Sequence, residues 1–136
     1  MMSKSIYVID DYLINLMVAK MIIKHHGFFD KITLYSEAQK ALEDLVGNRD
    51  NKMLLPDVIL LDIHMPVMNG WQFLDEFEMI NPCFVKDIEI YILSSSTDIA
   101  EIRRSRQYKS VNGFLSKPLE AEMLENMLTT RLPNAS

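Results

Sequence analysis

Short apolar runs, separated by longer segments of helical period, constrain the fold of this 136-residue chain more than any other feature. The run DVILLD has no polar residue between Asp57 and Asp62, and the stretches SIYVI, KITLYS, IEIYILS and NGFLS are similarly short and rich in β-branched and aromatic residues. Continuous apolar strands are typical of a sheet that is buried on both faces. The pattern therefore predicts strands in the middle layer of an α/β domain.

The segments between and after these runs have the signals of helices. The first covers residues 12–27 and ends at Gly27, a common helix stop. Its apolar residues at helical spacing are Leu13, Leu16, Met17, Met21 and Ile22. Because most of the ten methionines lie among other apolar residues, we expect them mainly in the core.

Four more helices are predicted. One covers residues 36–48 with Ser36 as its N-cap, and the next runs from about Trp71 to Ile80 and is ended by Asn81-Pro82. The last two cover residues 96–108 and 119–132. Five strands that alternate with five helices predict a single domain with a doubly wound parallel sheet, covered on both faces.

Composition narrows the possible functions. A formal net charge of −5 leaves no basic patch that would neutralise nucleic-acid phosphates. No apolar stretch approaches the ~20 residues that span a bilayer, and the N-terminus lacks the apolar core of a signal peptide. The single cysteine, Cys83, cannot form an internal disulfide. We therefore expect a cytoplasmic protein that neither inserts into a membrane nor binds nucleic acid directly.

Polar residues follow four of the predicted strands and form the candidate site. In a doubly wound sheet, ligands bind outside the carboxyl ends of the strands. The residues at these ends are Asp10 and Asp11, Asp62, Ser94 to Ser96, and Lys117. Taken singly, each has a structural explanation, because Asp and Ser often cap helices or start turns and a loop lysine is usually solvated.

Their coincidence at successive strand ends favours a binding site over separate caps and turns. Three carboxylates that lie close together repel one another unless a cation neutralises them. A hard divalent ion with oxygen ligands is the natural partner, and Mg²⁺ keeps open positions for phosphate oxygens. The sequence therefore predicts a Mg²⁺ site at this edge of the sheet.

Four motifs, YVIDD, PDVILLDIHMPVMNG, ILSSS and GFLSKPL, resemble in order and spacing the receiver domain of bacterial two-component response regulators. The resemblance covers residues 4–131 and leaves 132–136 as a short tail. It implies a flavodoxin-like five-stranded sheet of order 2-1-3-4-5 and phosphorylation of an aspartate by a sensor histidine kinase or a histidine phosphotransfer protein. Because only PNAS follows the last helix, we expect a stand-alone, chemotaxis-type receiver that binds an unknown downstream protein.

The resemblance also implies a role for each motif residue. The phosphoacceptor would be Asp62, with Lys117 and Ser94 contacting the phosphoryl group and a cis bond between Lys117 and Pro118. Mg²⁺ would be held by Asp10, Asp11, Asp62 and the backbone carbonyl of His64. Phe114 matches the aromatic switch position. The His64 side chain has two interpretations, a proton-active group that changes the dephosphorylation rate or, as we favour, a solvated side chain whose backbone alone matters.

Two other functions compete with a phosphorylated switch. An aspartyl-phosphate phosphohydrolase also uses a strand-end aspartate, but this class normally has a second aspartate where His64 stands, and it needs a cap or larger core. A degenerate receiver would act only as a protein-binding module, and its usual mark is loss of an acidic residue or of the lysine. Since neither is lost here, we predict a signalling phosphoacceptor, which is not an enzyme beyond self-catalysed phosphotransfer and dephosphorylation.

Overall fold

The computed structural model describes residues 4–96 and 98–131. The strands of the described part are β1 (Ser5–Ile9), β2 (Lys31–Tyr35), β3 (Val58–Leu61), β4 (Glu89–Ser94) and β5 (Val111–Ser116). Its helices are α1 (Leu13–His26), α2 (Ala38–Gly47), α3 (Gly70–Ile80), α4 (Ile99–Ser105), α5 (Ala121–Arg131) and the short 3₁₀ helix η1 (Asn81–Cys83).

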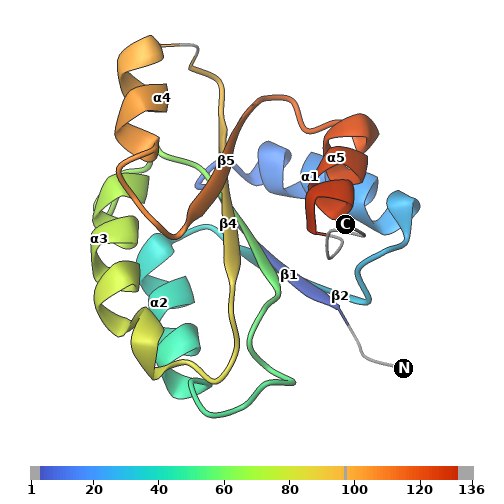
Figure 1. Cartoon of the computed structure of the whole chain (residues 1–136). Helices are drawn as coiled ribbons and strands as arrows, with labels where there is room; N and C mark the ends of the chain where they lie inside the picture. The colour runs from blue at the N-terminus through green and yellow to red at the C-terminus, as the bar shows by residue number, and fades with distance from the viewer. Residues whose placement is uncertain (1–3, 97, 132–136) are drawn as a thin grey trace.

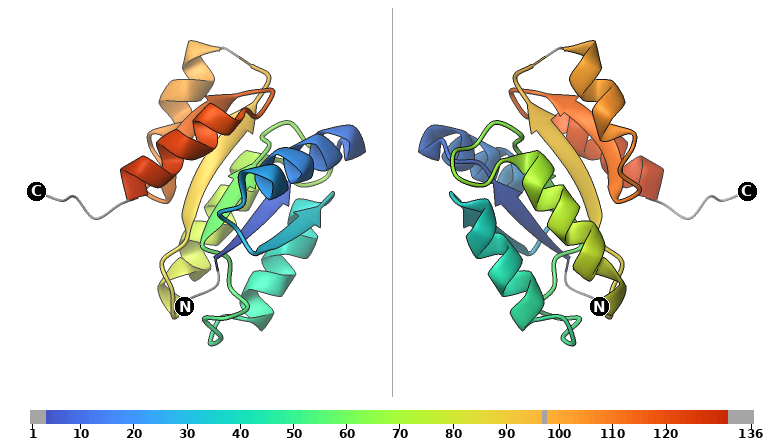
Figure 2. Two further views of the ribbon diagram at one scale, coloured as in Figure 1. Left: turned by 90° about the vertical axis from the view of Figure 1, so that its right-hand side faces the viewer. Right: turned by 90° about the vertical axis from the view of Figure 1, so that its left-hand side faces the viewer.

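The strands form one parallel sheet with the order β2-β1-β3-β4-β5, which confirms the predicted flavodoxin-like topology. Helices α1 and α5 lie on one face of the sheet, and α2 and α3 lie on the other (Figures 1 and 2). The strand order reverses between β1 and β3, so the carboxyl ends of these two strands flank the crevice where such sheets bind ligands.

Two apolar clusters fill the layers between the sheet and the helices. One joins the sheet to α2 and α3 and includes Phe73 and Phe77, and the other joins it to α1 and α5 and includes Leu16 and Leu124. The central strand β3 is buried along its whole length, as the uninterrupted apolar run predicts. These two cores hold the strand ends rigidly at one edge of the sheet.

Several predicted helix boundaries are correct and others are wrong. Gly27 ends α1 in a left-handed conformation with φ of 87°, and Asn81 follows α3 as predicted. Ser36 is not an N-cap, because α2 begins at Ala38 and its N-cap residue is Glu37. Helix α4 begins at Ile99, after its capping Asp98, and not at Ser96. The predicted tail, residues 132–136, and Thr97 lie outside the described residues.

Helix α1 exposes five apolar residues, and three of them belong to the set that recurs at helical spacing. Only Leu16, Ala19 and Ile23 of this helix are buried. The exposed side chains form what we call the α1 surface, which consists of Leu13, Ile14, Met17, Val18 and Met21. Among the described methionines, Met53 and Met79 are also exposed, so the expectation of a mainly buried set is wrong. An apolar surface of this kind on a globular domain commonly marks an interaction site.

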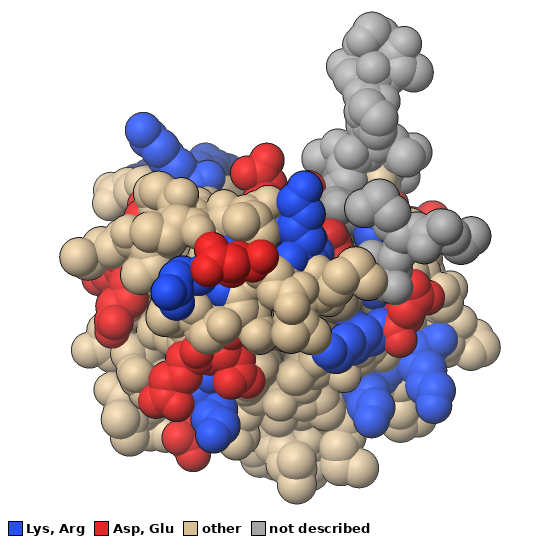
Figure 3. Space-filling view, turned by 90° about the horizontal axis from the view of Figure 1, so that it is seen from below, with Lys and Arg blue, Asp and Glu red and all other residues tan. Residues whose placement is uncertain are grey.

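Charge is mixed on the face seen from below the view of Figure 1. Lysine and arginine side chains alternate there with aspartate and glutamate, without a continuous region of one sign (Figure 3). In the part of the chain that the structure describes, none of the helices has the length and apolar character needed to cross a bilayer.

Candidate functional site

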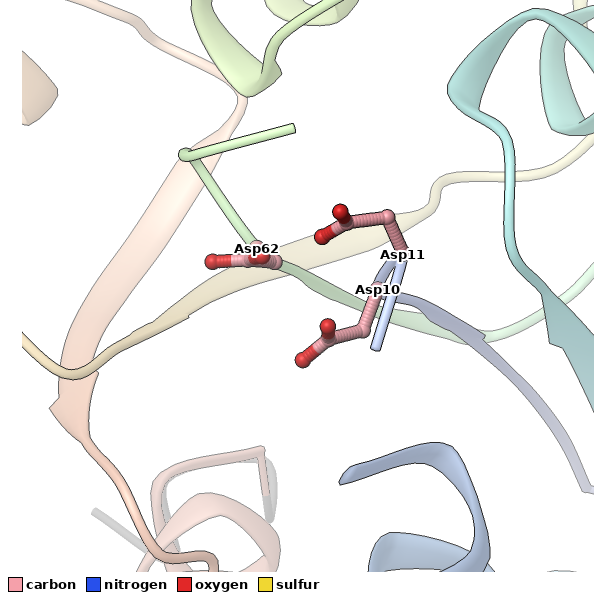
Figure 4. Close-up of side chains that lie close together, drawn as sticks. All are labelled: Asp10, Asp11 and Asp62. Carbon is pink, nitrogen blue, oxygen red and sulfur yellow. The ribbon is translucent and has the colours of Figure 1, made fainter. Parts of the chain in front are cut away.

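Three carboxylates gather at the carboxyl ends of β1 and β3. Asp10 and Asp11 follow β1 and Asp62 follows β3, and the Asp62 amide donates to the carbonyl of Ile9, which ties the two strand ends together. One oxygen from each carboxylate lies within 4.8 Å of the other two (Figure 4). Asp10 and Asp62 are buried, whereas Asp11 is exposed. The predicted convergence of these residues is therefore observed.

Lys117 reaches the same cluster from the end of β5. Its Nζ donates to Asp10 Oδ2 at 2.7 Å and lies 3.4 Å from Asp62 Oδ1. The Lys117 amide donates to the carbonyl of Ser94, and the Lys117–Pro118 bond is cis as predicted. The ammonium group therefore bridges two of the three carboxylates and offsets part of their mutual repulsion.

The Asp62 carboxyl is electrostatically perturbed. Burial raises its pKa, and the nearby Asp10 charge raises the pKa further, while Lys117 and the backbone amide of His64 act in the opposite direction. The net effect is a raised pKa, so the folded protein holds an Asp62 charge that it only partly neutralises. Added positive charge at this point would stabilise the ionised form.

The loop between β3 and α3 is shaped by close backbone packing. A Cβ atom on Gly70 would lie 2.6 Å from Ile63 Cδ1 and 2.7 Å from the carbonyl oxygen of Asp62, so only glycine fits there. Asn69 and Gln72 form a capping box at the start of α3, which the spacing N-x-x-Q indicates but our sequence prediction missed. Val67 has φ of 65°, a strained conformation for a β-branched residue.

Two other residues missed from sequence hold Asp10 in place. The Tyr12 amide donates to Asp10 Oδ1 at 2.9 Å, and Asn15 Nδ2 donates to Asp10 Oδ2 at 3.2 Å. Asn15 lies in the first turn of α1, and only the folded structure shows that its side chain points back to the strand end. Asp10 is therefore not the N-cap of α1, which is Tyr12, and its side chain faces the acidic cluster.

Ser94 and Phe114 lie on the paired strands β4 and β5, two positions apart in register. Ser94 is fully buried at the end of β4, and its Oγ accepts a hydrogen bond from the Ser96 amide at 3.1 Å. Phe114 pairs in register with Ile92 on β4 and is half-buried. It lines a cavity of about 330 Å³ between α4 and β5, together with Ile102 and Ser105.

The His64 side chain has a partner on another element. It is exposed, yet its Nε2 lies 3.0 Å from Oε2 and 3.3 Å from Oε1 of Glu101 in the first turn of α4. Its backbone amide faces Asp62 Oδ1 at 3.4 Å. The prediction of a solvated side chain is therefore incomplete, because this residue contacts both the acidic cluster and α4.

The donor set is chemically suited to Mg²⁺. It consists of carboxylate oxygens, which are the ligands that this ion prefers, and the cluster is open to solvent at Asp11. Beside it lies a cavity of about 390 Å³ whose lining includes Tyr12, Val18, Lys117 and Pro118. An incoming group can therefore reach the cluster along the side of α1.

Comparison with known proteins agrees with this geometry. Residues 6–129 match the family model of the response regulator receiver domain. The crystal structure of a two component response regulator from Cytophaga hutchinsonii superposes with a TM-score of 0.82 at 27% identity, over 96% of this chain and 97% of that one. The probable methanogenesis regulatory protein FilR2 of Methanothrix harundinacea is 26% identical over 120 residues, which are 88% of this chain and 76% of that protein.

A longer relative is the hybrid signal transduction histidine kinase I of Dictyostelium discoideum. It is 24% identical over 139 residues, which cover 97% of this chain but only 7% of the kinase. The fold and the family match define a single-domain α/β signalling module of two-component systems. The chain belongs to the response regulator receiver domain family.

Proposed function

We propose that the chain is a phosphorylated switch of a histidine-to-aspartate phosphorelay, in which residues 4–131 form the receiver and Asp62 accepts the phosphoryl group. One observation carries this proposal: Asp62 ends a buried strand with its carboxylate between the Asp10–Asp11 pair and Lys117 Nζ. A carboxylate used only for a turn needs neither a lysine at 3.4 Å nor two acidic neighbours.

The chemistry follows from these positions. The Asp62 carboxylate is the nucleophile that attacks phosphorus in line, and the donor's leaving group departs on the opposite side. Lys117 neutralises charge on the transferred group, and the Ser94 hydroxyl, which keeps its own proton for donation, hydrogen-bonds a phosphoryl oxygen. Asp10, Asp11, Asp62 and the His64 carbonyl would hold Mg²⁺, which would supply further positive charge to the phosphoryl oxygens.

The phosphodonor would approach over the α1 surface. That surface adjoins the cavity that Lys117 and Val18 line, so a protein seated on α1 can place a reactive group beside Asp62. The same helix exposes Lys20 and Lys24, which favours a partner with acidic residues around an apolar centre. We propose that a histidine kinase or a histidine phosphotransfer protein covers this surface during transfer.

A degenerate receiver that binds proteins without phosphorylation is the second candidate. The geometry favours it less, because all three carboxylates lie within 4.8 Å of one another and the lysine contacts two of them. Transfer to Asp62 would change the surroundings of Ser94 and Phe114, and a downstream partner would recognise the changed face of α4, β5 and α5. This output distinguishes a switch from an enzyme with a released product.

The test is uptake of a phosphoryl group from a small donor. The protein is incubated with acetyl phosphate, with Mg²⁺ or with a chelator, and its intact mass is measured. We expect a mass increase of one phosphoryl group with Mg²⁺ only, and none for Asp62→Asn. The matched control is Asp87→Asn, a change at an exposed aspartate. Undiminished labelling of Asp62→Asn, or none of wild type, would reject the proposal.

A further inference from the structure

Helix α4 is held by few contacts. It has seven residues, from Ile99 to Ser105, and of these described residues only Ser105 is buried. A helix this short is unstable by itself in water, so its position depends on tertiary contacts. Ile99 exposes 63% of its surface, so apolar burial at the N-terminal end of α4 contributes little. Polar contacts therefore have a large share in fixing this helix.

Two side-chain contacts join α4 to neighbouring parts of the structure, one to α3 and one to the loop between β3 and α3. Near its C-terminal end, the guanidinium of Arg104 lies 4.5 Å from the ring centre of Trp71 on α3. At its N-terminal end, Glu101 contacts His64 of the β3–α3 loop through both carboxylate oxygens. The second contact involves a residue only two positions after Asp62.

We propose that the His64–Glu101 pair is a latch that holds the N-terminal end of α4 against the β3–α3 loop, and that phosphorylation of Asp62 opens it. The hydrogen bond requires only an N–H on His64 Nε2, so the latch forms with neutral or charged imidazole. The opening step rests on the proposed function, whereas the latch in the resting protein does not.

We expect the latch to open because the phosphoryl group on Asp62 and the carboxylate of Glu101 compete for His64 in the β3–α3 loop. The His64 amide already faces Asp62 Oδ1 at 3.4 Å, so the loop backbone is within reach of new phosphoryl oxygens. Conversion of the ionised Asp62 carboxylate to an acyl phosphate replaces one negative charge with about 1.5 to 2, and it adds three strong acceptors. These charges attract the His64 backbone and side chain and repel the Glu101 carboxylate, so they weaken the contact between the two residues.

Glu101 also has a role that needs no latch. An acidic residue in the first turn of a helix interacts favourably with the helix dipole. His64 distinguishes the two roles, because it lies outside α4 and its replacement leaves the helix sequence unchanged. A latch requires that His64→Ala loosen α4 as Glu101→Ala does, whereas the dipole role predicts an effect of Glu101→Ala alone.

The experiment is hydrogen exchange of the α4 amides, followed by mass spectrometry, in wild type, His64→Ala, Glu101→Ala and the double variant. We expect each single change to speed exchange about twofold to fivefold, the range that an exposed ion pair provides, and the double variant to add nothing further. Alanine favours helices, so a faster exchange in Glu101→Ala cannot come from helix propensity. The matched controls are His25→Ala and Glu43→Ala, at exposed positions on α1 and α2.

The same samples are then treated with acetyl phosphate and Mg²⁺, and the phosphorylated fraction is read from the intact mass. Phosphorylation should speed α4 exchange in wild type and change it much less in either single variant. Additive or absent effects in the resting proteins would overturn the latch. If the mass does not increase, the proposed function fails together with the opening step, while the resting-state comparison still decides whether the latch exists.

Discussion

Replacement of Asp62 by asparagine should stabilise the metal-free protein. The change keeps the shape of the side chain and removes a buried negative charge from the acidic cluster. At an effective dielectric constant of about 20, each neighbouring carboxylate within 4.8 Å opposes the Asp62 charge by about 3 kcal/mol, and Lys117 at 3.4 Å favours it by about 5 kcal/mol. Because solvent screens the exposed Asp11, the repulsion and the attraction nearly cancel.

The cost of burying the ionised carboxylate then decides whether Asp62→Asn stabilises or destabilises the protein. Removing a buried, imperfectly satisfied group of this kind is worth about 1–3 kcal/mol, so we expect Asp62→Asn to raise the free energy of unfolding by that amount at pH 7. The measurement is urea denaturation in the presence of a chelator. Asp87→Asn, at an exposed position, is the control that should change stability little.

The pH dependence gives this prediction a second test. The pKa of Asp62 is raised in the folded state above its ordinary value of 3.8. Between pH 3.8 and this raised pKa, the folded state therefore binds more protons than the unfolded state. Wild-type stability from this group therefore falls as the pH rises through that window, and the advantage of Asp62→Asn should shrink as the pH falls toward 3.8. Mg²⁺ should also stabilise wild type more than the variant. A less stable variant, or an advantage that is equal at pH 4 and pH 7, would refute the reasoning.

Four further predictions concern single residues. Gly70→Ala should cost about 1–3 kcal/mol in denaturation and slow phosphorylation by acetyl phosphate, because the new Cβ displaces the Asp62 loop; unchanged values would contradict the close approach. Val67→Asn should add about 1 kcal/mol of stability by relieving the positive φ of a fully exposed residue, and a loss of stability would contradict this explanation. Ile14→Lys should reduce transfer from a histidine phosphotransfer protein about tenfold while leaving acetyl phosphate labelling unchanged, unlike the exposed control Met79→Lys. Ser94→Ala should leave Asp62 able to accept phosphate but reduce the NMR shift of Phe114 on adding beryllofluoride, whereas a full shift would exclude this coupling.

The sheet and the acidic cluster were predictable because they follow from rules that act along the chain. Continuous apolar strands imply a sheet buried on both faces, and parallel strands bring their carboxyl ends to one edge. Asp62, Asp10 and Lys117 therefore lie together at this edge as predicted, although 107 residues separate Asp10 from Lys117. The roles assigned to these residues remain predictions.

The remaining features depend on packing that no local pattern specifies. Helix α1 is apolar on most of its circumference, so periodicity did not reveal that Leu16 faces the core and Met21 faces solvent. The N-cap residue of α2 is Glu37 and not Ser36, because helix ends vary by one or two residues when several polar residues compete for the cap position. His64 and Glu101 are 37 residues apart and have no shared motif, so their contact appears only in the folded chain.

The central claim is that Asp62 forms an acyl phosphate, and borohydride reduction tests it most directly. This reagent reduces an acyl phosphate to an alcohol, so a phosphorylated aspartate becomes homoserine, which peptide mass spectrometry can locate. After treatment with acetyl phosphate and Mg²⁺, we predict homoserine at position 62, and none when Mg²⁺ is chelated. Reduction at Asp10, at Asp11 or at another carboxylate in place of Asp62 would contradict the account.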